Sequence, residues 1–391
     1  NENQELKVKK VSEERFYHYL KFDSIINPGE SISCYFEVWD NDAINGNKST
    51  KSELISFKEL SREEIEKERD SQNEHIISSF DQALNLNLEI KKELNEFNKS
   101  LIDKKNLNWE DKKRAGSIIE KQKQLKDLIS ENVKENEKNN QKNEKLNSSN
   151  IEKQKKLEEL MKELLDEETQ KLLEEFNEML EKMDKEKIKE ALDKIQEKSE
   201  NLDKDLDRNL ELFKEMAFEQ KLEETINKID NVKEKQKNLK EETENNKSNM
   251  NQLSEKQGQI KKELEEIEEK LNELKEKNND LENKKDIPET KEESNKAGES
   301  MEKSKKSLKN KMKKKSSKEQ GEAIENLEKM SEKMNALQSS CSNSQPVEDM
   351  ETLRQILENL IVLSFDQEEL IEKISALPQN STGIVKYIQN Q

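Results

Sequence analysis

The sequence predicts a mostly α-helical protein, in which long antiparallel coiled-coil helical hairpins follow a partial β-sandwich. Charged residues make up 41% of the 391 residues and hydrophobic residues only 29%, which suits narrow helical seams better than one compact core. Only four prolines and seven glycines interrupt the chain, so long helices can continue without breakers. Aromatic and β-branched residues gather instead in short runs within residues 1–58.

The first segment has the pattern of β-strands. Short runs rich in aromatic and β-branched residues occupy positions 15–22, 31–40 and 52–57. Turn signals separate these runs, at Pro28-Gly29 and at Asn45-Gly46. The middle run alternates as a half-buried strand does, so we interpret this segment as the closing strands of a β-sandwich. Because the chain begins inside β-like sequence, we expect it to be part of a longer protein.

Two helix beginnings follow the strands. Ser61 and Glu64 form a capping box, which predicts a helix over residues 61–104. Asn108 is a good N-cap for a second helix, and acidic residues in the first turn favour its dipole. Apolar residues recur at steps of three and four along one face of the first helix. This stripe contains Ile76, Phe80, Ala83, Leu86, Ile90, Leu94, Phe97 and Leu101.

The helical pattern continues, with two interruptions, to residue 239. Polar residues 134–150 predict the tip of a hairpin, and the apolar pattern resumes at Ile151. A bend is predicted near Asp166–Thr169, before a long helical block over residues 188–239.

The clearest heptads precede Pro288, which is expected to end their helix and with it the coiled-coil region of residues 59–288. A repeat of 3.5 residues predicts a left-handed supercoil. Asn278 occupies a seam position, where it would either fix the register at a cost in stability or reflect the Asn-rich composition. The seam positions are Leu253, Gln257, Ile260, Leu264, Ile267, Leu271, Leu274, Asn278 and Leu281.

The last two segments differ sharply in composition. Residues 289–347 are rich in Lys and Ser, and we expect weak helices there and a linker at 339–346. Residues 348–391 form an apolar helical segment: positions 351–391 contain 15 Leu, Ile, Val and Phe, against five in the 50 residues before them. We expect this helix to pack between at least two others, so that Leu360→Asp would unfold the region.

No residue pattern for catalysis or metal binding is present in the sequence. A phosphate loop needs two glycines five residues apart followed by Lys, and none of the seven glycines meets this requirement. His18 and His75 have no Cys or carboxylate at ligand spacing, so we interpret both as ordinary surface or half-buried residues. We therefore predict no catalytic, cofactor-binding or metal-binding residue, no cofactor and no enzymatic activity.

Two further features have both a functional and a structural interpretation. The acidic triplet "DND" at 40–42 could hold calcium, but Lys51 stands where an EF-hand loop needs Glu. Asx turns that close a hairpin fit this triplet better. Cys34 and Cys341 are too few to indicate a redox compartment, and we interpret them as unpaired thiols.

The net charge of −18 argues against general binding to polyanions. One segment departs from this balance, because Lys303–Lys318 contains nine lysines and no acid. It could contact nucleic acid or an anionic lipid surface. It holds no aromatic residue for base stacking, and acidic helices flank it. We favour a solvated or internally neutralised helix face, and a contact patch is the alternative.

Four stretches of the chain carry a resemblance to one family. They are "YFEVWDNDAINGNKSTKS" (35–52), "NWEDKK" (108–113), "LDRNLELFKEMAFEQKLEE" (206–224) and "LRQILENLIVLSFDQEEL" (353–370). Their order and spacing also agree across nearly the whole chain. On these stretches the sequence resembles the large membrane-anchored coiled-coil proteins of Bacteroidetes-type bacteria, a domain-of-unknown-function family in which immunoglobulin-like β domains precede long helices.

The resemblance implies that residues 1–58 end an immunoglobulin-like domain and that this region lies on the periplasmic side of the inner membrane, anchored by upstream segments. It supplies no functional residues to transfer. The expected function is a non-enzymatic structural or scaffolding role in the cell envelope, with protein partners or self-association through the coiled-coil helices. The alternative is a cytosolic chromosome-organising or nucleic-acid-binding coiled-coil protein. Lys303–Lys318 favours that alternative, whereas the acidic charge and the missing phosphate loop oppose it.

Overall fold

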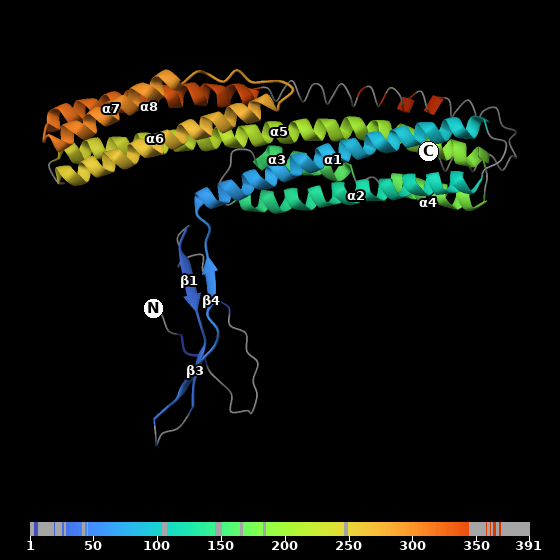
Figure 1. The fold of residues 1–391 in the computed structure, drawn as a ribbon, viewed down its shortest axis with the longest axis horizontal. Coiled ribbons are helices and arrows are strands. Elements are labelled where there is room, and N and C mark those ends of the chain that lie inside the picture. The colour runs from blue at the N-terminus through green and yellow to red at the C-terminus, as the bar shows by residue number, and fades with distance from the viewer. Residues whose placement is uncertain are drawn as a thin grey trace. The chain divides into compact units, whose positions relative to one another are not determined.

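A computed structural model gives the fold, which is mostly helical with a few short strands (Figure 1). The structure describes residues 4–6, 19, 26, 29–40, 44, 46–103, 108–144, 151–164, 167–182, 185–245, 249–343, 357, 360, 363, 364, 367 and 368. The chain divides into two compact units, Asn1–Leu210 and Glu211–Gln391, which are described separately below. Within the described residues, no helix carries the apolar stretch that crossing a bilayer would require.

Four short strands pair into two antiparallel two-stranded sheets. β1 (Ser31–Cys34) pairs with β4 (Ile55–Lys58), and β2 (Glu37–Trp39) pairs with β3 (Ser49–Lys51). The run predicted over 31–40 is therefore two strands, interrupted where the Ser52 hydroxyl and amide bond the Phe36 backbone. The run predicted over 15–22 lies outside the described residues, apart from Tyr19.

The expected half-buried face is seen on β1, where Ile32 and Cys34 are half-buried, but not on the other strands. Val38 and Trp39 are 62% and 58% exposed, and Ile55 and Phe57 are exposed as well. Both predicted turns have the backbone that glycine permits, since φ is +88° at Gly29 and Gly46. The described part of this segment is thus a pair of two-stranded ribbons with apolar side chains in solvent.

The helices of the first unit begin where the sequence predicts. They are α1 (Arg62–Asp103), α2 (Trp109–Glu144), α3 (Ile151–Glu163), α4 (Glu167–Lys182) and the first part of α5 (Lys185–Glu244). The Ser61 hydroxyl accepts from the Glu64 amide at 3.2 Å, and the Glu64 carboxylate accepts from the Ser61 amide at 2.9 Å. Asn108 and Asp111 form the same reciprocal pair at α2. The predicted bend near Asp166–Thr169 falls at the beginning of α4, whose residues from Glu167 onward are helical.

In the first unit α2 packs antiparallel to α1, α3 and α4 follow one another along α2, and α5 runs antiparallel to α1 (Figure 1). Hydrogen bonds and ion pairs between neighbours fix these directions, because partner numbers fall on one helix as they rise on the other. On α1 and α2 the pairs are Asn73–Asn139, His75–Glu135 and Glu89–Lys121, and on α1 and α5 they are Lys91–Asp203, Asn95–Gln196 and Asn98–Asp193. The buried interior includes Ile76, Phe80, Ile90, Leu94, Phe97, Leu101, Ile118, Leu125, Met161, Phe176, Ile188, Leu192 and Ile195.

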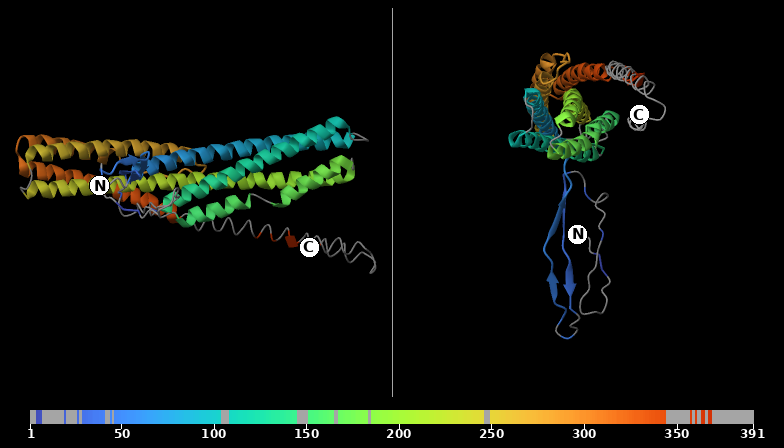
Figure 2. Two further views of the ribbon diagram at one scale, coloured as in Figure 1. Left: turned by 90° about the horizontal axis from the view of Figure 1, so that it is seen from below. Right: turned by 90° about the vertical axis from the view of Figure 1, so that its right-hand side faces the viewer.

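Four helical segments build the second unit: the part of α5 from Glu211 onward, α6 (Met250–Asn279), α7 (Lys291–Lys309) and α8 (Lys313–Asn343). They lie alongside one another with alternating direction (Figure 2). Ion pairs link α5 to α6, α6 to α7 and α7 to α8, and polar contacts link α8 back to α5. Examples are Lys235–Glu263, Lys261–Glu302, Lys333–Glu293 and Ser331–Asp230. This is the arrangement of a four-helix bundle.

The predicted heptad seam of α6 is confirmed as a buried stripe. Leu253, Gln257, Ile260, Leu264, Ile267, Leu271 and Leu274 are all buried. Asn278 departs from both interpretations offered for it: its amide donates to the Lys285 carbonyl at 2.9 Å, and its oxygen accepts from the Lys285 amide at 2.7 Å. It therefore closes the loop after α6, which ends at Asn279, nine residues before Pro288.

The segment expected to be weak is densely packed. The expectation of weak helices over 289–347 is wrong for the described residues, because α7 and α8 bury a continuous apolar face. The linker expected from 339 is also displaced, since α8 continues to Asn343 and buries Cys341. The buried face comprises Ala297, Met301, Leu308, Ala323, Leu327, Met330, Met334, Leu337 and Cys341.

The apolar segment 348–391 lies outside the described residues except at six positions, all of them helical. Its expected burial is not seen at the leucines among them: Leu357, Leu360 and Leu363 are each more than half exposed. The best-packed interior of the second unit is instead formed by α5 to α8.

Candidate functional site

A buried layer of polar side chains crosses the interior of the second unit. All four helices contribute to it: Gln236 and Thr243 from α5, Gln257 from α6, Ser304 from α7, and Ser316 and Gln320 from α8. Each of these six residues is fully buried. We call this set the polar layer. Buried apolar residues flank it on both sides along α6 and α7, and its polar atoms bond one another or the backbone.

Gln257 is the centre of the polar layer. Its amide donates to the Gln236 oxygen at 2.6 Å, and Gln236 donates back at 3.2 Å. The Gln257 oxygen also accepts from the Ser304 hydroxyl at 2.8 Å and from the Gln320 amide at 3.3 Å. Ser304 and Ser316 share a hydrogen bond of 3.0 Å, and the Gln320 amide reaches Thr243 at 3.2 Å. The layer thus joins every helix of the bundle through one side chain.

Such a layer selects one alignment of the helices. Sliding any helix by one turn would bury these groups against apolar neighbours, and each unpaired polar group would then cost about 1–3 kcal/mol. One atom already has this problem, since the Gln320 oxygen is buried and bonds no described residue. The polar layer therefore lowers the stability that an apolar interior would give, while it disfavours other registers.

A buried group of charges lies on α5 and α6 of the same unit. The Lys221 ammonium pairs with Glu224 at 3.3 Å and with Glu273 at 2.5 Å, and Lys270 also reaches Glu224 at 3.1 Å. Lys221 and Glu224 are nearly fully buried. The lysines and glutamates of this group pair with one another across α5 and α6. We therefore interpret them as groups that fix the pairing of the two helices, not as catalytic carboxylates.

Partly buried ion pairs also link neighbouring helices of this unit. Hydrogen bonding to Lys333 on α8 lowers the pKa of the Glu293 carboxyl on α7, and Lys261 on α6 does the same to Glu302 on α7. Both glutamates stay ionised as structural partners. Neither has the raised pKa that a general acid needs at neutral pH.

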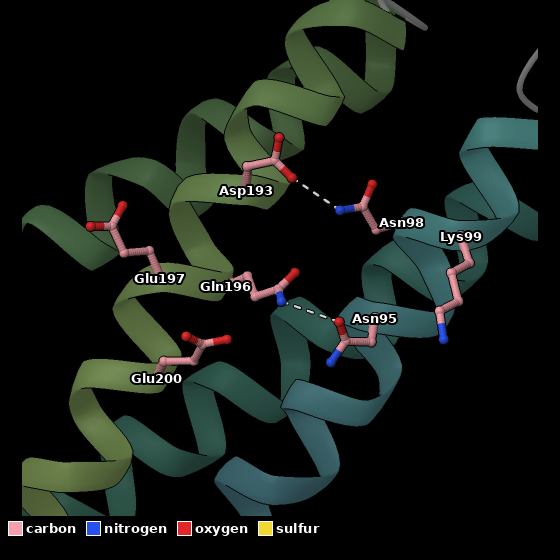
Figure 3. Close-up of a pocket in the computed structure, with 7 residues that line it drawn as sticks. All are labelled: Asn95, Asn98, Lys99, Asp193, Gln196, Glu197 and Glu200. Carbon is pink, nitrogen blue, oxygen red and sulfur yellow. Dashed lines mark hydrogen bonds between the residues drawn. The ribbon is translucent and has the colours of Figure 1, made fainter.

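A polar groove of about 520 Å³ lies between α1 and α5 in the first unit (Figure 3). Two hydrogen bonds cross it: Asn98 donates to Asp193 at 3.0 Å, and Gln196 donates to Asn95 at 3.1 Å. Because its own side chains bridge it, the groove is a helix–helix seam that opens to solvent. The lining residues are Asn95, Asn98, Lys99, Asp193, Gln196, Glu197 and Glu200.

The first unit has a second polar interior, on α2. Asn132 and Asn136 lie one turn apart and are at most 1% exposed, yet neither side-chain amide bonds any described residue. Asn139, a turn further on, donates to Asn73 of α1 at 2.7 Å. Buried amides without partners weaken this part of the unit.

The sequence-based candidates occupy separate places. His75 bonds Glu135 at 2.8 Å on an exposed surface, and His18 lies outside the described residues. Asp40 accepts from the Lys48 amide at 2.9 Å, which is a contact between the two arms of the hairpin, and the predicted Asx turn falls on residues 41–42, which lie outside the described residues. Neither Cys34 nor Cys341 forms a disulfide in the described part of the chain. Over the described ranges, no three His, Cys, Asp or Glu side chains are placed to hold a metal ion.

The Lys-rich segment divides into two parts. Lys303, Lys306 and Lys318 lie near Glu299, Glu302 and Glu322 at 3.7–4.0 Å, as the interpretation of a neutralised helix face expects. The lysines at the turn between α7 and α8 do not share this pairing. Those lysines are Lys309, Lys311, Lys314 and Lys315, and all four are exposed.

Sequence reasoning missed the polar layer, although one signal for it was present. Gln257 occupies a seam position among apolar residues, and a polar residue there indicates a buried hydrogen-bonding partner. Its partner Ser304, and Ser316 which bonds Ser304, come from a Ser-rich segment that composition alone assigns to solvent. Comparison with family models, with curated proteins and with solved structures finds no match to this chain.

Proposed function

We propose that the chain is a non-enzymatic scaffold, composed of long coiled-coil helical hairpins that follow the end of an immunoglobulin-like domain in a membrane-anchored protein of the cell envelope. The observation that supports a scaffold best is the polar layer centred on Gln257. The polar layer lowers stability but favours one defined alignment of the four helices. A scaffold needs such a defined alignment, because it holds other proteins or domains at fixed positions.

Three further observations support this proposal. The α6 seam follows heptad steps and is buried from Leu253 to Leu274, as in coiled coils. The strands leave Val38, Trp39 and Phe57 in solvent, and further strands of an immunoglobulin-like sheet would cover such side chains. The family resemblance adds the membrane anchor and the periplasmic side. Protein partners or self-association through the helices fit the same role.

Cell fractionation of the full-length protein in its own bacterium tests the location. We expect the protein in the membrane pellet, and protease should cut this region only after the outer membrane is made permeable. Recovery from the soluble cytosolic fraction, or protection from protease in spheroplasts, would overturn the envelope proposal.

The alternative of a cytosolic nucleic-acid-binding coiled coil has one observation in its favour, the lysines of Lys303–Lys318. The net charge of −18 opposes it. A gel-shift assay with duplex DNA and with RNA across a salt series separates the two functions. A shift at low salt that weakens as salt rises would support nucleic-acid binding, and the scaffold proposal expects none.

A further inference from the structure

The turn between α7 and α8 concentrates positive charge at one end of the second unit. Lys309 ends α7, and Lys314 and Lys315 lie in the first turn of α8. Lys311 stands between the helices, next to Met312, whose side chain is 52% exposed. Together with Lys313, these residues form what we call the basic tip.

Local structure accounts for Lys309, which the helix dipole favours in the last turn of α7, but not for the lysines of the basic tip that follow it. Lys311 has a φ of +58°, in the left-handed region where glycine or asparagine is the usual choice and a side chain adds strain. Lysines in the first turn of α8 face the positive end of the helix dipole, which favours acidic residues instead. Folding alone would therefore select other residues at these positions.

Acidic groups at this end of the unit leave four of the five lysines of the basic tip without an ion pair among the described residues. The end of α5 lies here, because Ser317 bonds Glu244 at 2.6 Å and Gln320 bonds Thr243. Glu242 is already paired with Lys256 at 2.7 Å. None of Lys309, Lys311, Lys314 and Lys315 has an ion pair with an acid in the part of the chain that the structure describes.

We propose that the basic tip binds an anionic lipid surface end-on. Lysine ammonium groups attract phosphate and carboxylate headgroups, and each lysine near such a surface raises partitioning roughly fivefold. Met312 projects an apolar side chain from the same turn, where it can enter the headgroup region. This contact is a property of the described chain and does not depend on the membrane anchor proposed above.

The same observations disfavour a nucleic acid as the occupant. The basic tip has no aromatic side chain on which a base could stack. A duplex lying along the helices would meet a strongly acidic protein, which repels phosphates. A lipid surface, by contrast, can touch the tip alone.

Vesicle co-sedimentation of the whole chain tests the proposal. We expect binding to phosphatidylcholine vesicles that contain about 30% phosphatidylserine but not to phosphatidylcholine alone, and weaker binding when salt rises from about 0.05 M to 0.3 M. Changing Lys309, Lys311, Lys314 and Lys315 together to Gln should lower the partition coefficient at least tenfold.

A control with the same change in charge makes this test specific. Lys262, Lys275, Lys284 and Lys291 are exposed lysines of the same unit away from the tip, and their joint change to Gln should leave binding within about twofold of the unaltered chain. Circular dichroism confirms that both variants stay folded. Equal losses in the two variants, absence of binding to anionic vesicles, or binding to duplex DNA but not to vesicles would each overturn the proposal.

Discussion

At the scale of single residues, two side chains of the second unit occupy positions that local rules disfavour. Gln257 is a fully buried amide on a hydrophobic seam, and its oxygen accepts three hydrogen bonds. Lys311 is a residue other than glycine whose backbone φ is positive. The first is compensated by partners on the other three helices. The left-handed backbone at Lys311 lets the Lys311 and Met312 amides bond the Leu308 and Ser307 carbonyls, a cap for α7 that glycine would form without side-chain strain. Their substitutions therefore have opposite expected signs.

Gln257→Leu should destabilise the chain by about 2–4 kcal/mol, because Gln236, Ser304 and Gln320 would lose a buried partner. Urea unfolding followed by circular dichroism measures the change. Gln259→Leu is the matched control, since Gln259 is exposed on the same helix, and we expect its effect to stay within about 0.5 kcal/mol. Equal effects of the two substitutions would show that the polar layer does not hold the bundle together.

Lys311→Gly should stabilise the chain by roughly 0.5–1 kcal/mol, because glycine adopts the left-handed conformation without side-chain strain. The gain is reduced by the greater freedom of glycine in the unfolded chain. Thermal or urea unfolding reads the change directly. Lys309→Gly, within the helix α7, should instead lower stability by about 1 kcal/mol. A loss of stability in Lys311→Gly would mean that the lysine side chain makes a favourable contact in the turn.

At the scale of helices and loops, side chains that bond backbone groups decide where each element ends. Ser61 with Glu64, and Asn108 with Asp111, begin α1 and α2. Asn278 acts at the other end of a helix, where it holds the loop before α7. The first two devices were predicted from spacing along the chain. The bond from Asn278 was not predicted, because it forms only when the loop after α6 brings Lys285, seven residues further on, back to the end of the helix.

Asn278→Ala should release the loop that joins α6 and α7. It removes both hydrogen bonds to the Lys285 backbone, one of which protects the Lys285 amide from solvent. We expect faster hydrogen–deuterium exchange at that amide and a loss of about 1–2 kcal/mol in stability. Asn279→Ala should change neither quantity appreciably, since the Asn279 side chain is exposed and accepts a hydrogen bond of 3.4 Å from the Lys284 side chain. Unchanged exchange in Asn278→Ala would contradict the proposed role.

Glu64 should give the first helix a dependence on acid pH. Hydrogen bonding to Lys58 and to the Ser61 amide lowers the pKa of Glu64 to about 2, from an ordinary value of 4.5. Folding therefore favours the carboxylate, so this stabilisation is fully present above pH 4.5 and is lost as the pH falls toward 2. A carbon-detected NMR titration measures the pKa, and Lys58→Ala should raise it toward 4.5. An unchanged pKa in that variant would exclude Lys58 as the main cause.

The packing of α7 against α8 explains why sequence analysis placed the weakest segment where the interior is dense. Counting large apolar residues finds few between 289 and 347. The structure packs these two helices with small buried residues instead, so the helices approach closely and methionines fill the remaining space. The small residues are Ser294, Ala297, Ser300, Ser304, Ser307, Ser316 and Ala323. The stripes on α1 and α6 were predictable because they consist of large apolar residues at helical spacing.

At the scale of the whole chain, two units solve the same problem of building an interior from a polar sequence. Each buries narrow apolar seams and places amides between them, around Asn132 and Asn136 in the first unit and around Gln257 in the second. The first set lacks partners among the described residues, whereas the second forms a connected layer. We therefore expect the second unit to be the more stable one. Sequence alone could predict the seams, but not which helices would share them.

Aspartate substitutions of Leu327 and Leu360 test which helical segments stabilise the chain. Leu327 is fully buried on α8, so Leu327→Asp would place a charge in the apolar interior and should abolish the cooperative unfolding transition of the second unit. Leu360 is 55% exposed, so Leu360→Asp should change stability by no more than about 0.5 kcal/mol. This reverses the effect that hydrophobicity alone predicts for Leu360. Thermal melting of both variants by circular dichroism decides between them, because unfolding by Leu360→Asp would mean that a further interface covers residues near the end of the chain.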